Sequence, residues 1–155
     1  MAFLRALLLI AFATLPALAQ GEVREGLALP SETFKRPMRY TIYLPPGYEQ
    51  SKRTYPVVYR FHGFGDDDAA WIHNGELAET LDRAIADRKV TPMIVVMPDG
   101  GVSWYVNSAD GASKWEDYFM KEFMPFIEER FRVRPQRGSR AIGGVSMGGY
   151  GALSY

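Results

Sequence analysis

Short apolar segments recur along the chain, and each is bounded by turn-forming residues. Residues 39–44 alternate apolar and polar side chains, which predicts a half-buried strand. Residues 57–61 and 141–145 predict two further short strands. The run at 93–97, between Pro92 and Pro98, is typical of a strand buried on both faces of a sheet. Residues 21–37 are a polar, charged lead ahead of these strands.

Two segments between the predicted strands show the periodicity of helices. Residues 76–87 repeat apolar side chains at helical spacing, and from Trp115 onward Phe119, Phe123, Phe126 and Ile127 share one helix face. Pro125 is expected to bend this second helix. Alternating strands and helices predict an α/β fold, with a mostly parallel sheet and helices on both faces, over residues 20–155 as part of one domain. Its loops at 62–70, at 99–113 and at Ser146 should meet at one rim, where such sheets bind ligands.

Composition narrows the function. Lysine plus arginine balance aspartate plus glutamate at 18 each, so nucleic acid is not an expected partner. The absence of cysteine excludes disulfides, thiol nucleophiles and a lipidated cysteine. No metal and no cofactor is expected, and the oligomeric state is unknown at this point.

The first 19 residues have the pattern of a signal peptide. Arg5 precedes an apolar run from Ala6 to Leu15, and the small-residue site Ala17-Leu18-Ala19 closes the segment. A membrane anchor is the alternative, but the run is shorter than the roughly 20 residues of a spanning helix. We therefore expect cleavage before Gln20, a secreted or periplasmic protein, and no stable membrane insertion.

Gly144-Val145-Ser146-Met147-Gly148 is a G-x-S-x-G pattern that follows a predicted strand. This context is that of a nucleophile elbow, in which a strained turn exposes the serine oxygen and glycines let the chain pass close by. Ser146 is therefore the candidate catalytic nucleophile. The alternative is a glycine-rich turn without catalysis.

Two backbone N–H groups are candidate donors to an oxyanion. An elbow supplies one from the residue after the serine, here Met147. The second is expected from Phe64, because Gly63 and Gly65 free its N–H to turn inward. These glycines could instead make only a tight exit from the strand.

The base that should activate Ser146 is missing from the sequence. The chain holds two histidines, His62 and His73, and both precede Ser146, whereas this fold orders serine, acid and then histidine. His62 is expected to shape its loop and contact substrate, and His73 to lie on the surface. We expect the acid and the histidine beyond Tyr155, and the 155-residue chain to be an N-terminal fragment, inactive or poorly active alone.

Two other features lie on the rim loops. Asp66, Asp67 and Asp68 are consecutive, unlike the alternating ligands of a calcium loop, which favours a solvated loop or a helix cap. Trp104 and Tyr105 are candidate substrate-binding residues that line an acyl or aromatic cleft, or alternatively a lid over the sheet edge.

With these residues in place, the chain resembles a family of esterases with the α/β-hydrolase fold that includes esterase D, feruloyl and acetyl-xylan esterases and the mycobacterial mycolyltransferases. The matching segments lie at 43–48, 55–58, 62–63, 98–100, 103–105 and 144–152. The resemblance implies an acyl-enzyme on Ser146, oxyanion donors at Met147 and Phe64, and a small-molecule or carbohydrate ester as partner.

Several activities fit that resemblance. A leader disfavours the cytosolic hydrolase of S-formylglutathione and favours a secreted esterase of carbohydrate or phenolic esters. Acyl transfer to a sugar acceptor, a noncatalytic binding module and a serine peptidase on the same scaffold stay open. Activity on a short-chain ester separates an enzyme from a binding module, and amide hydrolysis would favour the peptidase.

The leader generates the first testable prediction. When the chain is expressed with its leader in a bacterial host, sequencing of the exported protein should find Gln20 at the amino terminus, because small residues at 17 and 19 form the cleavage site. An intact Met1 on periplasmic protein would contradict the prediction.

Overall fold

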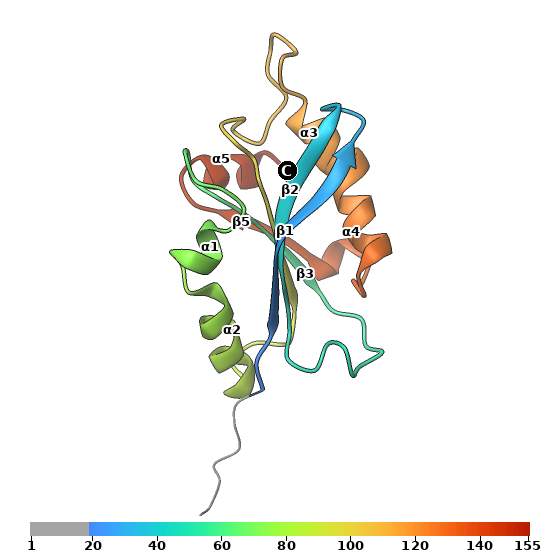
Figure 1. Ribbon diagram of the computed structural model, residues 1–155, viewed down its shortest axis with the longest axis vertical. Coiled ribbons are helices and arrows are strands. Elements are labelled where there is room, and N and C mark those ends of the chain that lie inside the picture. Colours follow the sequence, from blue (N-terminus) through green and yellow to red (C-terminus); the bar gives the residue numbers. More distant parts are fainter. Residues whose placement is uncertain (1–18) are drawn as a thin grey trace, which may run out of the picture.

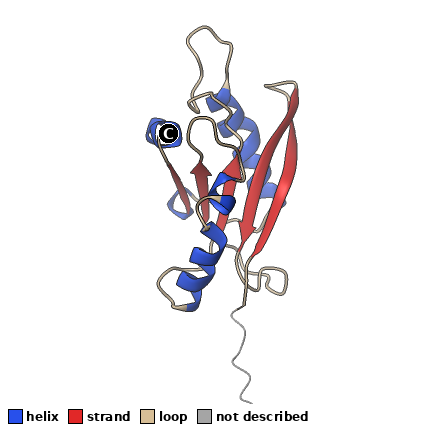
Figure 2. Ribbon diagram, turned by 60° about the vertical axis from the view of Figure 1, so that its left-hand side comes forward, coloured by secondary structure: helices blue, strands red, loops and turns tan. Residues whose placement is uncertain are grey.

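The computed structural model describes residues 19–155, and the leader predicted over residues 1–19 therefore lies almost wholly outside the described residues. The strands in the described part are β1 (Glu22–Ser31), β2 (Arg36–Leu44), β3 (Val57–Phe61), β4 (Ile94–Pro98) and β5 (Arg140–Gly144). They form one sheet in the order β1-β2-β4-β3-β5 (Figure 2). The strands predicted at 39–44, 57–61, 93–97 and 141–145 match β2, β3, β4 and β5 to within three residues.

The expected α/β fold is confirmed, with one refinement of the sheet. β4, β3 and β5 pair in parallel, but β2 runs antiparallel to both of its neighbours, β1 and β4. The sheet is therefore mixed. The parallel part, which needs helical crossovers between its strands, is also the part that leads to Ser146.

β1 is the strand that the sequence pattern does not predict, because residues 21–37 have the composition of a polar lead. Its pairing with β2 shifts register between Arg24 and Leu27, around Gly26 at a φ of 66°. Val23 packs on one face of the sheet and Leu27 on the other, although their even spacing would place them on the same face of a regular strand. Because of this bulge, apolar and polar residues do not alternate regularly along β1. That alternation is the pattern from which an edge strand is predicted.

Helices cover the sheet on both sides (Figure 1). On one side lie α1 (Ala70–His73) and α2 (Leu77–Ala86), and on the other lie α3 (Trp115–Tyr118), a π-helical turn η1 (Phe119–Phe123) and α4 (Met124–Arg130). A short 3₁₀ turn η2 (Arg137–Ser139) precedes β5, and α5 (Met147–Ser154) follows it. The helix predicted over 76–87 is thus confirmed as α2.

The helix predicted from Trp115 changes its winding before Pro125. The π-helical turn ends at Phe123, and Pro125 lies in the first turn of α4. Proline has no N–H to donate to the preceding turn, and a widened turn accommodates that loss without breaking the helix. The structure thus has a π-helical turn where the sequence predicted a bend, and Phe119, Phe123 and Ile127 are all buried.

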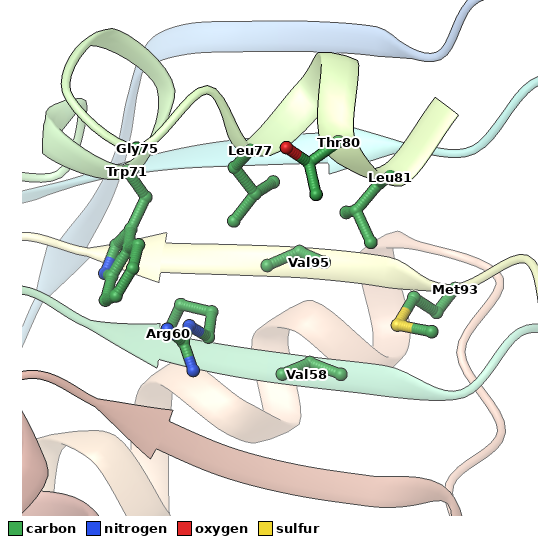
Figure 3. Close-up of a pocket in the computed structure, with 9 residues that line it drawn as sticks. All are labelled: Val58, Arg60, Trp71, Gly75, Leu77, Thr80, Leu81, Met93 and Val95. Carbon is green, nitrogen blue, oxygen red and sulfur yellow. The ribbon is translucent and has the colours of Figure 1, made fainter. Parts of the chain in front are cut away.

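A shallow apolar groove of about 280 Å³ lies on the face that α2 covers (Figure 3). Val58 and Val95 form its floor, and Leu77 and Leu81 of α2 form one wall. The Arg60 guanidinium lies 3.9 Å from the centre of the Trp71 ring. The Arg60 side chain extends from β3 toward Gly143 on the neighbouring strand β5. Its Nη1 occupies the space that a side chain at Gly143 would need.

The first turn of α5 packs directly on the end of β3. A Cβ added to Gly148 would lie 2.4 Å from the Phe61 carbonyl oxygen and 2.6 Å from that of His62. A Cβ added to Gly144 would lie 2.4 Å from the carbonyl carbon of Gly148. Backbone therefore touches backbone at this crossing, and both glycines are required by contact distance rather than by a positive φ.

This packing predicts opposite effects for two adjacent glycines. Gly148→Ala should lower the free energy of unfolding by about 3 kcal/mol, because its methyl group meets immobile backbone. Gly149→Ala should leave it unchanged or raise it by up to about 1 kcal/mol, since its Cβ meets nothing closer than 3.5 Å and alanine favours a helix. Urea denaturation of the two variants measures the difference, and equal stabilities would contradict the account of the crossing.

Candidate active site

Ser146 stands in a strained turn between β5 and α5. Its φ of 52° and ψ of −117° lie in a region that residues other than glycine rarely adopt, at a cost of about 1–3 kcal/mol. The residue is exposed, and the Tyr150 N–H donates to its carbonyl oxygen at 3.0 Å. The turn thus presents the serine at the amino end of α5, where the unpaired N–H groups of the helix favour negative charge.

The loop after β3 runs alongside this turn. A Cβ on Gly63 would lie 3.6 Å from Cγ1 of Val145 and 3.9 Å from its carbonyl oxygen, so the loop touches the residue before Ser146. Phe64 follows with its side chain 63% exposed, and Gly65 has a φ of 84°. Phe64 and Met147 therefore lie on the two segments that adjoin Ser146, and their roles as oxyanion donors stay predictions.

His62 lies inside the protein and links the two rim loops. Its side chain is 1% exposed, its Nδ1–H donates to the Gly63 carbonyl at 2.8 Å, and its Nε2 accepts the Gly100 N–H at 2.9 Å. Both ring nitrogens are thereby used, which defines the neutral tautomer with the proton on Nδ1. These hydrogen bonds are those of a residue that shapes its loop, and the contact of His62 with substrate stays a prediction.

Tyr105 is also an internal support, and its assignment to substrate binding stays a prediction. Its ring is fully buried and stacks on Phe61 with centroids 4.1 Å apart, and its hydroxyl oxygen accepts the His62 backbone N–H at 2.9 Å. Burial raises the pKa of Tyr105, so the phenol stays neutral. Gly100 and Gly151 make room for it, because a Cβ on either would lie within 2.5 Å of the tyrosine.

Trp104 points the other way and joins an exposed aromatic group. Trp104 and Tyr105 both have a positive φ, near 60°, a strained arrangement that sends one ring outward and the next inward. Trp104 is 48% exposed and lies 5.6 Å from the Tyr150 ring and 6.5 Å from the Phe64 ring. We call Phe64, Trp104 and Tyr150 the aromatic cluster. Sequence reasoning missed Tyr150, although its position four residues after Ser146 places it one helical turn away.

The three consecutive aspartates at 66–68 differ in their exposure to solvent. Asp66 and Asp67 are exposed, as a solvated loop requires, whereas Asp68 is only 3% exposed. Asp68 accepts hydrogen bonds from Arg39 and Thr41 of β2. The solvated-loop interpretation is therefore wrong for Asp68. Among residues 19–155, no group of three or more histidines, cysteines or acids could hold a metal ion.

In the described part of the chain, no hydrogen bond joins the Ser146 side chain to a histidine or a carboxylate. His73, which was predicted to lie on the surface, is exposed on α1 and pairs with Glu25 of β1 at 3.0 Å. His62 uses both of its ring nitrogens on backbone groups.

Over residues 19–155 no helix is both long and apolar enough to span a bilayer.

Comparison with known proteins gives relatives that are named as esterases. The chain is 41% identical over 121 residues to "Esterase Rv1288" of Mycobacterium tuberculosis, which covers 74% of this chain and 25% of that protein. It is 32% identical over 126 residues to an "Endo-1,4-beta-xylanase/feruloyl esterase" of Xylanibacter ruminicola, covering 77% of this chain and 17% of that one.

A solved structure of a "ferulic acid esterase" superimposes with a TM-score of 0.80 at 34% identity, over 88% of this chain and 55% of that one. The chain thus spans about half of that structure and a quarter or less of these two relatives. A family model described as "Putative esterase" matches residues 31–155, and the chain belongs to that family, on the α/β-hydrolase fold.

Proposed function

We propose that the protein is an exported serine esterase that hydrolyses carboxylic esters through an acyl-enzyme on Ser146. The conformation of Ser146 carries the proposal. A serine that only caps a helix has extended backbone angles and uses its hydroxyl oxygen on the helix N–H groups. Ser146 has a positive φ and makes no side-chain cap hydrogen bond, so its hydroxyl is free for chemistry. Membership of the esterase family supports the same conclusion.

The reaction follows from groups around the turn. The Ser146 oxygen attacks the ester carbonyl carbon while its proton passes to a base, and the resulting oxyanion is stabilised by the N–H groups of Met147 and Phe64. The carbonyl–oxygen bond to the alcohol then breaks, and the alcohol leaves with the proton from the base. Water, activated by the same base, attacks the acyl-enzyme and releases the acid and the free serine.

We place the base and its acidic partner outside these 155 residues. His62 hydrogen-bonds to backbone groups and His73 pairs with Glu25, so neither histidine is paired with Ser146, which supports this assignment. The chain covers only 55% of the solved ferulic acid esterase, which leaves ample length for both groups. A serine without a base stays protonated, so the 155-residue chain alone should turn over esters poorly.

An ester with a phenolic acyl group is the substrate that the aromatic cluster favours. Flat exposed rings beside the nucleophile provide stacking and edge contacts for another ring, each worth about 0.5–1.5 kcal/mol beyond area burial. Phe64 and Tyr150 are close in sequence to a proposed oxyanion donor and to the nucleophile, so a ring held there lies next to the reacting carbonyl. Relatives named as feruloyl and ferulic acid esterases support this substrate class.

Ser146→Ala tests the nucleophile. In the complete gene product, hydrolysis of p-nitrophenyl acetate should fall by a factor of order 10⁶, because the acyl-enzyme cannot form. Ser154→Ala, on the exposed face of the same helix, is the matched control and should retain wild-type turnover. Near wild-type turnover in Ser146→Ala would refute the proposed mechanism, and ligand binding without any turnover would favour a binding module.

Trp104→Ala tests the substrate class. It should lower kcat/KM for methyl ferulate by about tenfold, the loss of roughly 1.4 kcal/mol of ring contact. Its effect on ethyl acetate, which has no ring, should stay within about twofold. Val102→Ala, also exposed on the same loop but outside the aromatic cluster, is the control. Equal losses on both esters would exclude recognition of an aromatic acyl group by Trp104.

A further inference from the structure

Asp68 is a buried carboxylate whose side-chain partners all lie on β2. Its Oδ1 accepts hydrogen bonds from Nη2 and Nε of Arg39 at 2.7 and 3.2 Å, and its Oδ2 accepts one from the Thr41 hydroxyl at 2.7 Å. Thr41 is itself fully buried. A buried carboxylate that loses its partners is strongly unfavourable, so Asp68 is held at this one place.

The segment that carries the Phe64 N–H lies between two such fixed points. At its start, His62 is held by the Gly100 N–H and by the Tyr105 hydroxyl. At its end, Asp68 is held by β2. Between them the chain contains two glycines, and the Phe64 side chain is too exposed to fix the backbone. The two fixed ends, together with the hydrogen bond from the Asp66 N–H to the Gly63 carbonyl at 3.2 Å, therefore decide where the Phe64 N–H points.

Arg39 connects this segment to the second rim loop. Its Nη2 lies 3.5 Å from Asp67 and its Nε lies 3.6 Å from Asp99, in addition to the bonds to Asp68. Its carbonyl oxygen accepts the Asp99 N–H at 2.9 Å. One residue of β2 thus contacts the loops on both sides of the site, although two strands, β4 and β3, separate β2 from the strand that leads to Ser146.

We propose that Asp68 and Arg39 are positioning residues that hold the Phe64 N–H in place for the oxyanion, an inference that rests on the proposed esterase function. Neither residue touches the substrate. The ion pair acts through the loop between His62 and Asp68. It gives a role to the one acid of the run at 66–68 that is buried, and to an arginine that no catalytic pattern selects.

Asp68→Asn in the complete gene product is the principal test. It keeps the shape of the side chain and removes the charge that Arg39 pairs with. The value of kcat for methyl ferulate should fall by about 10- to 100-fold, the range expected when an oxyanion donor is misplaced by about an ångström. KM should change by less than about twofold, and affinity for a trifluoromethyl ketone analogue, which mimics the oxyanion, should fall in parallel with kcat.

Controls separate positioning from general stability. Asp87→Asn removes an exposed acid that pairs with Lys89 far from the rim, and it should behave as wild type. Arg39→Gln should resemble Asp68→Asn, while Arg39→Lys, which keeps the charge, should recover part of kcat. All assays are run at a temperature where circular dichroism shows each variant folded.

Amide hydrogen exchange at Asp66, whose N–H donates to the Gly63 carbonyl at 3.2 Å, is the readout that does not depend on turnover. Exchange there should become at least about tenfold faster in Asp68→Asn, with little change in the strands. Unchanged exchange, or wild-type kcat with unchanged ketone affinity, would overturn the proposal. If the wild-type protein shows no turnover that depends on Ser146, the esterase function fails instead, and exchange alone then decides whether Asp68 holds the loop.

Discussion

The contact between the end of β3 and the first turn of α5 organises the site. The Phe61 carbonyl oxygen accepts the Val145 N–H at 3.4 Å and Nε1–H of Trp71 at 3.2 Å, and it leaves no room for a side chain on Gly148. Because backbone meets backbone here, the chain can only pass from β5 into α5 through a sharp turn. Ser146 occupies that turn, so its strained conformation is a consequence of how closely the two elements pack.

Aromatic packing supplies stabilisation against this strain. Trp104 and Tyr105 add two further residues with positive φ, at about 1–3 kcal/mol each. Complete burial of the Tyr105 ring contributes about 1.5–3 kcal/mol, and its stacking on Phe61 adds about 0.5–1.5 kcal/mol. These terms are of the same size. The strained loop can therefore persist because one of its two rings is buried, and the other ring is left exposed beside Tyr150.

Two buried polar side chains, His62 and Asp68, fix the two ends of the loop that follows β3. His62 and Asp68 are each surrounded by partners that satisfy them, one from the loop at 99–113 and the other from β2. Such groups add little net stability, since the free energy of desolvation offsets their hydrogen bonds. They restrict the loop to one arrangement, which is what a site built on backbone N–H groups requires.

The sequence by itself predicted most of the elements and the candidate nucleophile. Apolar runs and periodicity are local properties, and they predicted four of the strands, both helical regions and the elbow at Ser146. The bulge at Gly26 concealed β1, because it moves apolar positions from one face to the other within a single strand. Only the tertiary structure decided that Asp68 is buried, that Tyr105 is a support and that Tyr150 joins Trp104 and Phe64. Those roles depend on contacts between segments that are far apart in the sequence. The spacing of residues along one strand or helix does not predict such contacts.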